Sequence, residues 1–360
     1  MMEVAIAYDT LSRWGGQELV TYAMAKALNE NGFTVDLVLL FDGKLDSRLA
    51  DIPARRIVSV FEYDPNLPIR GLTRNVVTGL ASLGYDLTIN TVYHVLLWPF
   101  DIGYLNNPGT YMPPYRLRRR LFIELNRIML PILGPRILLA NSRWTLSQLP
   151  YRPRLSGVLY PPVMPRDCGS RVKEDVVVSV GRIAPDKRTT DIVDMMEAAY
   201  SRYPKAAYYV IGLPYNEAYL RQVKERVRHV ELVLDASEGV KWDYLCRAKV
   251  LLHAAVNEHF GLVVAEAQAA GAVPVVHRSG GAWSDIVEYG RYGFGYLNHA
   301  EAVDAMVKLL TNDDLYRRYS IRARRHSLQF TYNAFKMRLI RYVNVALGLN
   351  AASKETVGAV

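Results

Sequence analysis

The chain has 360 residues, of which half are hydrophobic and 22% are charged. This length predicts about two domains, and this composition supplies apolar material for two cores and excludes an intrinsically disordered chain. The formal net charge of +9 is compatible with nucleic acid, an anionic membrane face or phosphorylated substrates as partners, and the sign alone does not choose among them.

The beginning of the chain and its cysteines bear on location. Residues 3–8 are apolar but have no basic segment before them, which argues against a signal peptide. No run of about 18 apolar residues is free of charges, so no membrane-spanning helix is predicted. Cys168 and Cys246 form no metal-binding pattern. We expect two free thiols and a cytoplasmic protein, because disulfides are rare in the cytosol.

In the first part of the chain, β-rich runs alternate with a helical pattern. Residues 3–8 are predicted as the first strand, residues 17–31 as the first helix and residues 34–40 as the second strand. Such alternation is typical of βαβ units that build a parallel sheet. Further strands are predicted at residues 57–60, 87–90, 102–105 and 137–140.

A proline-rich stretch at residues 160–165 interrupts this alternation. Proline lacks the N–H donor and fixes φ, so the stretch is neither helix interior nor central strand and is predicted to be an interdomain linker. The alternation then resumes. Strands are predicted at residues 176–180, 207–211, 230–234, 250–254 and 273–277, and helices at 189–203 and 217–226.

Together these elements predict an α/β protein with two Rossmann-like, parallel-sheet domains facing a central cleft. Ligands of open parallel sheets usually bind in such a crevice. The predicted boundaries are residues 1–160 for the first domain and residues 161–330 for the second. Residues 331–360 are predicted to form a helix that returns to the first domain and a flexible tail.

The first candidate site feature is the pair Gly15 and Gly16, between the first strand and the first helix. Glycine lets the backbone approach a ligand closely, and the helix N-terminus offers free N–H groups to an anion. The pattern is not the G-x-G-x-x-G fingerprint, which disfavours a nicotinamide cofactor. A plain tight turn explains the pair equally well.

Two cations follow the strand at residues 176–180. Arg182 offers a planar fork of donors and Lys187 a point charge, so a loop that holds both can bind a diphosphate. The alternative interpretation is a solvated surface loop. Gly280 and Gly281, after the strand at residues 273–277, either approach the same phosphates or form an ordinary turn.

The most informative pattern is a pair of glutamates, Glu258 and Glu266, with Gly261 between them. Glu258 is predicted in a loop and Glu266 about one turn into a helix over residues 262–270. The N–H groups of Gly261 and Leu262 would open that helix toward a phosphate, and a carboxylate can accept hydrogen bonds from vicinal sugar hydroxyls. Two solvated glutamates at a helix end are the weaker alternative.

Taken together, these motifs resemble the GT4-type family of retaining glycosyltransferases, which have the GT-B fold. Within that family, residues 252–261, 269–271 and 279–281 are most similar to the eukaryotic α-1,2-mannosyltransferases that extend a dolichol-linked oligosaccharide with GDP-mannose. The resemblance covers nearly the whole chain and is carried by Gly15-Gly16, Asn141-Ser142, Trp144-Thr145, Tyr160-Pro161-Pro162-Val163, Gly181-Arg182, Lys187, Glu258, Glu266 and Phe330-Thr331-Tyr332.

The resemblance implies that residues 1–160 form the acceptor-side domain and residues 161–330 the nucleotide-sugar-binding domain. It also implies roles for single residues. Arg182 and Lys187 would bind the donor diphosphate and stabilise the charge of the leaving group. Glu258 would hold the transferred sugar, and Glu266 the ribose hydroxyls. The remaining donor contacts would come from Gly16, Phe260, Gly261 and Leu262.

One position departs from the family pattern. The family often has a histidine after a strand of the first domain, and Asn106 stands there in this sequence. Asparagine donates a hydrogen bond to a sugar hydroxyl but is neither acid nor base at neutral pH. In the family's front-face reaction the leaving phosphate takes the acceptor proton, so this change is compatible with activity. His94 lies nearby in the sequence and either approaches the sugar or packs inside the domain.

No metal or cofactor is expected, because the chain has no Asp-x-Asp motif. The donor would be a nucleotide sugar, with GDP-mannose favoured, and the acceptor a glycan or a polyprenyl-lipid-linked saccharide. Residues 115–133 combine a basic start with an apolar helical pattern, which indicates either peripheral membrane contact or a core-facing helix. No nucleic-acid module is recognised. A nucleotide-sugar epimerase and a non-catalytic sugar-nucleotide-binding protein are the alternative functions.

Overall fold

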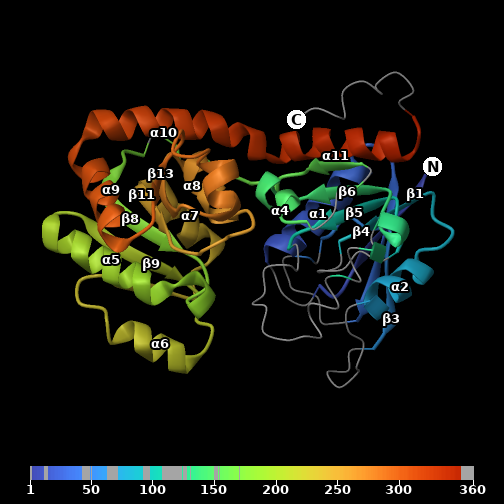
Figure 1. The fold of residues 1–360 in the computed structure, drawn as a ribbon, viewed down its shortest axis with the longest axis horizontal. Helices are drawn as coiled ribbons and strands as arrows, with labels where there is room; N and C mark the ends of the chain where they lie inside the picture. The colour runs from blue at the N-terminus through green and yellow to red at the C-terminus, as the bar shows by residue number, and fades with distance from the viewer. Residues whose placement is uncertain are drawn as a thin grey trace. The chain divides into compact units, whose positions relative to one another are not determined.

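The structure is a computed structural model, and it describes residues 2–11, 15–42, 49, 51–62, 72–91, 98–107, 124, 128–129, 131–149, 153, 155–169 and 171–349. The chain forms two compact units. One comprises Met1–Pro162 and Tyr332–Val360, and the other comprises Val163–Thr331 (Figure 1). Each contains one parallel sheet flanked by helices, so the predicted α/β class with two Rossmann-like sheets is confirmed.

The first unit has a seven-stranded sheet of order β3-β2-β1-β4-β5-β6-β7. The order reverses direction between β1 and β4, which is the switch point at which ligands of such sheets usually bind. Apart from its first residue, β1 is completely buried, as expected for a parallel strand covered on both faces. The strands are β1 (Glu3–Tyr8), β2 (Thr34–Phe41), β3 (Arg56–Phe61), β4 (Leu87–Asn90), β5 (Ile102–Leu105), β6 (Ile137–Ala140) and β7 (Ser156–Val158).

The helices of this unit include one from the far end of the chain. Helix α11 packs against α1, and its residues Tyr332 and Lys336 contact the Glu30 carboxylate at 3.0 and 2.8 Å. Residues after 331 are therefore part of the first unit. The helices are α1 (Gly16–Asn29), α2 (Leu72–Ala81), α4 (Arg143–Ser147) and α11 (Tyr332–Ala346).

A buried carboxylate ties β2 to its neighbours. The Asp36 side chain is completely buried, and it accepts hydrogen bonds from Arg55 at 2.7 and 3.0 Å, from Arg56 at 2.8 Å and from Tyr85 at 2.8 Å. The hydrogen bonds from Arg55 hold the pKa of Asp36 far below its usual range, although burial opposes this effect. These contacts satisfy a buried charge that would otherwise destabilise the sheet.

We expect Asp36→Asn to lower the free energy of unfolding by about 3 kcal/mol at neutral pH, because it leaves two guanidinium groups without their buried partner. A carboxylate with a depressed folded-state pKa stabilises the fold above its unfolded pKa of about 4, and this contribution fades as the pH falls further. Urea unfolding at several acidic pH values should therefore show a shallower acid loss in Asp36→Asn than in the wild type. Equal stability of the two proteins at neutral pH would contradict this account.

The second unit repeats the Rossmann order with six strands, β10-β9-β8-β11-β12-β13. All its strand pairs are parallel, so the carboxyl ends of the strands meet at one edge. The strands are β8 (Glu174–Val180), β9 (Ala207–Gly212), β10 (Glu231–Leu234), β11 (Ala248–His253), β12 (Val273–His277) and β13 (Phe294–Tyr296).

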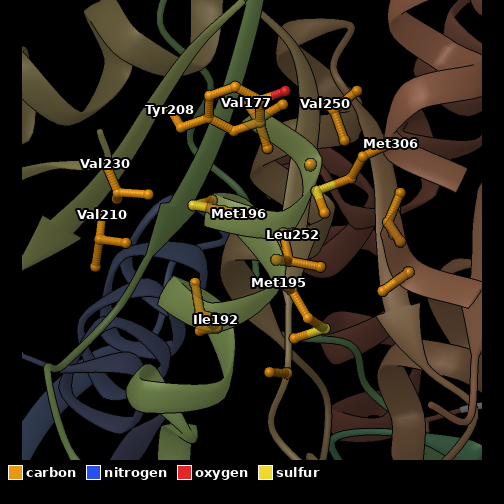
Figure 2. Packing of buried hydrophobic residues seen from close by; sticks show 14 of the residues in the cluster. Val177, Ile192, Met195, Met196, Tyr208, Val210, Val230, Val250, Leu252 and Met306 are labelled. Carbon is orange, nitrogen blue, oxygen red and sulfur yellow. The ribbon is translucent and has the colours of Figure 1, made fainter. Parts of the chain in front are cut away.

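The helices of the second unit begin at polar caps and cover a methionine-rich core. Asn216, Ser237, Asn298 and Asn312 each accept a hydrogen bond from a first-turn N–H. Figure 2 shows Met195 and Met196 packed among valines of the sheet. The helices are α5 (Thr189–Arg202), α6 (Glu217–Lys224), α7 (Glu238–Arg247), α8 (Leu262–Ala270), α9 (His299–Thr311) and α10 (Asp313–Ser327).

The expectation of two free thiols is wrong. Cys168 and Cys246 form a disulfide, with Cα atoms 5.4 Å apart and a sequence separation of 78. Helix α7 packs on β8 and brings Cys246, at its end, next to the segment that leads into that strand. A pair so distant in sequence forms no local pattern, so only the fold reveals the pairing.

Removing this disulfide should destabilise the second unit. The chain-entropy model gives a loss of about 4 kcal/mol for a loop of this length. We expect Cys168→Ser with Cys246→Ser to lower the melting temperature, and dithiothreitol to lower that of the wild type by the same amount. A melting temperature that responds to neither change would contradict the pairing.

Candidate active site

The cation-bearing loop follows β8 in the second unit. It contains a short 3-10 turn, Pro185–Lys187, and Arg188 after it adopts a left-handed conformation with φ 54°. Lys187 Nζ lies 2.5 Å from Glu258 Oε2. The Arg182 side chain is 55% exposed and pairs with Asp186 at 2.9 Å. The structure therefore brings Lys187 to Glu258, whereas Arg182 contacts neither candidate glutamate.

Glu258 is held as an ion inside the loop after β11. Burial alone would raise its pKa, but Lys187, followed by His253, lowers the pKa of Glu258 far below the usual range. His253 Nε2 lies 3.3 Å from the same oxygen, Oε2, without completing a hydrogen bond. No described residue contacts the other oxygen, Oε1, through a hydrogen bond or ion pair, so Oε1 is available to accept one from a ligand.

The loop that carries Glu258 rests on the glycine turn after β12. The Gly281 N–H donates to the Glu258 carbonyl at 2.7 Å, and the Asn257 N–H donates to Ser279 Oγ at 2.7 Å. A Cβ at Gly280 would lie 2.3 Å from the Glu258 carbonyl oxygen, and one at Gly281 2.2 Å from that of His259. These two glycines are therefore required because another backbone segment packs directly against them.

Glu266 lies in α8 and is paired with a residue that the sequence analysis did not identify. Lys241 Nζ contacts Oε1 and Oε2 of Glu266 at 2.9 and 3.0 Å, and it also contacts Glu238 at 2.8 Å. Burial raises the pKa of Glu266, and the charge of Lys241 opposes this shift. Because each carboxylate oxygen has a second lone pair, Glu266 can still accept a hydrogen bond from a hydroxyl group.

The start of α8 combines a structural side chain with open backbone donors. The Phe260 ring is buried and packs edge-on against Phe330, so this residue can serve a ligand only through its backbone. Gly261, at the N-cap, has φ 94°, a conformation that favours glycine. Leu262 is the first helical residue. The Val264 N–H donates to the Gly261 carbonyl at 2.8 Å, which leaves the N–H groups of Leu262 and Val263 without an acceptor inside the helix.

The other predicted site residues belong to the first unit. Gly16 begins α1 and is exposed, and a Cβ there would contact nothing within 4 Å. Asn106 follows β5, and its buried Nδ2 has no hydrogen-bond partner in the described structure. His94 lies outside the described residues, as does most of the segment 115–133. Ile128 and Ile132 in that segment are exposed.

Sequence reasoning missed the functional context of His253 and Lys241. His253 lies in the stretch that carries the resemblance, but no role was predicted for it. Because it ends β11, it lies beside the following loop. Lys241 is in α7, a helix that was not predicted, although Ser237 is a good N-cap residue. Pairing across elements is a tertiary property, so the sequence offered no direct signal for either contact.

Among the described residues, no group of histidine, cysteine, aspartate or glutamate side chains is arranged to hold a metal ion. Within the same residues, no helix combines the length and apolar character that a membrane span requires.

Comparison with known families covers the unit that carries these residues. Residues 164–326 match the family model described as "Glycosyl transferases group 1". This segment belongs to that family. The predicted resemblance to a glycosyltransferase is thereby confirmed for this segment, which includes the loops bearing Lys187, Glu258 and Glu266.

Curated relatives of the chain have named activities. The chain is 30% identical over 228 residues to "GDP-Man:Man(3)GlcNAc(2)-PP-Dol alpha-1,2-mannosyltransferase" of Neurospora crassa, a match that covers 55% of the chain and 40% of the relative. It is 32% identical over 171 residues to "D-inositol 3-phosphate glycosyltransferase" of Jonesia denitrificans, which covers 44% and 40%. The chain thus spans less than half the length of these relatives.

Solved structures support the fold over nearly the whole chain. The structure of Anabaena Alr3699/HepE in complex with UDP and glucose superposes with a TM-score of 0.74 and 15% identity, covering 96% of this chain and 100% of that one. WaaG, described as a glycosyltransferase involved in lipopolysaccharide biosynthesis, superposes with a TM-score of 0.68. At such low identity the likeness concerns the fold alone.

Proposed function

We propose that this glycosyltransferase moves mannose from GDP-mannose to a glycan or a polyprenyl-lipid-linked saccharide, with retention of the anomeric configuration. The observation that carries the proposal is the ion pair of Lys187 with Glu258 at the carboxyl edge of a parallel sheet. It places a fixed cation and an ionised carboxylate with one open oxygen side by side. A donor with a diphosphate and a hexose presents groups complementary to both.

The charge of the leaving group would be met by this chain's own cations. Lys187 and Arg182 follow β8, and the N-terminus of α8 follows the neighbouring strand β11. Preorganised donors of this kind stabilise negative charge as it develops on a leaving phosphate. Binding of the donor would weaken the contact between Lys187 and Glu258. We expect that no metal ion is required.

The sugar and the ribose would be held by the two carboxylates. Glu258 Oε1 would accept a hydrogen bond from a hydroxyl of the transferred hexose. Glu266, held in place by Lys241, would accept hydrogen bonds from the ribose hydroxyls. Gly16 and Asn106 are proposed for the acceptor side. His94 is a further candidate on the acceptor side. Residues 115–133, which include the exposed Ile128 and Ile132, are proposed to make peripheral contact with the membrane that carries a lipid-linked acceptor.

A donor screen tests this proposal. A ligand that binds only the folded state raises the melting temperature, so GDP-mannose should stabilise the protein more than UDP-glucose, UDP-galactose or free mannose. Turnover of GDP-mannose that depends on an added acceptor supports transfer, whereas conversion to another nucleotide sugar without an acceptor would indicate an epimerase. No stabilisation by any nucleotide sugar would contradict the proposal.

A further inference from the structure

Helix α10 presents a strongly basic outer face in the second unit. Its inner face is fixed by the buried residues Tyr316 and Ala323, and Tyr316 and Ser320 both donate to the Gly271 carbonyl, at 3.0 and 2.7 Å. The orientation of the helix is therefore set by packing, and the opposite side is exposed. That side carries Arg317, Arg318, Arg322, Arg324 and Arg325.

None of the five arginines forms an ion pair with a described residue. Both carboxylates of the helix lie in its first turn, where Asp313 contacts Lys249 at 2.7 Å and also feels the charge of Arg317. The charge of these arginines acts on a neighbouring lysine. Burial, and after it the charge of Arg324, lowers the pKa of Lys173 to about 7.

Two aliphatic side chains lie within this basic surface. At 3.6 residues per turn, Arg317, Ile321 and Arg324 fall on one line along the helix, and Leu328, just beyond its end, continues that line. Ile321 is 56% exposed and Leu328 is 65% exposed. Arg318, Arg322 and Arg325 form a parallel line beside it.

Helix electrostatics explain only part of this pattern. Cations in the last turn, such as Arg324 and Arg325, are stabilised by the carbonyl end of the helix. Arg317 and Arg318 lie in the first half, where the helix dipole gives a cation no advantage. Exposed aliphatic groups between cations fit a partner that offers both anionic groups and hydrocarbon, which a lipid surface does and a nucleic acid backbone does not.

We propose that the outer face of α10 is a docking surface for an anionic lipid bilayer, with the five arginines on the headgroups and Ile321 and Leu328 inserted among them. This surface belongs to the second unit and is distinct from residues 115–133 of the first. It does not depend on the donor or the acceptor of the transferase.

Sedimentation with vesicles tests this surface in the full chain. The wild type should bind vesicles of phosphatidylglycerol and phosphatidylcholine, bind pure phosphatidylcholine vesicles much more weakly, and lose binding as salt is added. Arg317→Gln, Arg318→Gln and Arg322→Gln together should lower the partition coefficient about a hundredfold, at about fivefold for each arginine. Ile321→Ser with Leu328→Ser should lower it about tenfold and leave the salt dependence unchanged.

A matched control removes three other exposed cations of the same unit, through Lys205→Gln, Lys224→Gln and Arg228→Gln. It should bind like the wild type, and circular dichroism should show that all variants are folded. Equal binding to both vesicle types, an equal loss in the control, or full binding by the arginine variant would overturn the proposal. Binding of duplex DNA as tight as that of vesicles, and unaffected by the Ile321 and Leu328 changes, would also overturn it.

Discussion

Glu258→Gln should lower the rate of sugar transfer by about two to three orders of magnitude, the range found when a preorganised polar group of an active site is removed. Glutamine has almost the same shape but no charge. It would therefore leave Lys187 without its buried counterion and weaken the acceptor for the sugar hydroxyl. The loss should fall mainly on kcat, because the contact is expected to strengthen as the sugar develops positive charge.

The partner residue allows a sharper version of this experiment. Lys187→Met should also lower kcat, and the double variant should lose much less than the product of the two single losses, because the two residues act as one ion pair. Glu231→Gln, at an exposed glutamate of β10, is the matched control and should be fully active. Wild-type turnover in Glu258→Gln would contradict a role for this ion pair in the mechanism.

Gly281→Ala should abolish transfer and destabilise the second unit by about 1 to 3 kcal/mol, the usual cost of overpacking. The new Cβ would lie 2.2 Å from the His259 carbonyl oxygen and 3.1 Å from Phe260 Cα. Both are backbone atoms, so the loop that carries Glu258 must move. Gly281 has φ −66° and ψ −29°, which alanine adopts readily, and the effect is therefore steric and not conformational.

Gly239→Ala is the matched control for this change. Its Cβ would lie 3.1 Å from the Nη1 atom of Arg166, the end of a flexible side chain, and 3.7 Å from Ser237 Oγ, an ordinary van der Waals contact. This variant should keep its melting temperature and its activity. If Gly281→Ala also kept its melting temperature and activity, the close packing of the glycine turn against the Glu258 loop would be contradicted.

Much of the fold could be predicted because parallel strands leave a strong signal. The predictions at residues 3–8, 87–90, 102–105 and 137–140 coincide with β1, β4, β5 and β6. Each is a short apolar run that is buried on both faces, so tertiary structure and local pattern agree. Boundaries shifted where the strand end is polar, as at Glu174, where β8 begins two residues before its predicted start.

The missed elements had weaker local patterns. β7 (Ser156–Val158) and β13 (Phe294–Tyr296) have three residues each and owe their existence to pairing with β6 and β12. Helix α10 (Asp313–Ser327) is rich in arginine and has few apolar positions, so its periodicity was not recognised. Short or strongly charged segments are determined by their neighbours more than by their own sequence.

The candidate site was predicted in part for the same reason. The resemblance implied that Lys187 and Glu258 bind one donor. In the structure each follows a strand of one parallel sheet, and the two form an ion pair. The contacts of Glu266 with Lys241 and of Glu258 with His253 depend on which helix packs where, which spacing does not encode. The disulfide of Cys168 with Cys246 is a third example of such long-range information.

The stereochemistry of the product tests the central claim most directly. The purified chain would be incubated with GDP-mannose and a saccharide acceptor, and the anomeric configuration of the product would be determined by NMR. The account predicts an α-mannosidic product that forms with the wild type and is almost absent with Glu258→Gln. A β-linked product, or transfer that is equally fast in the variant, would contradict it.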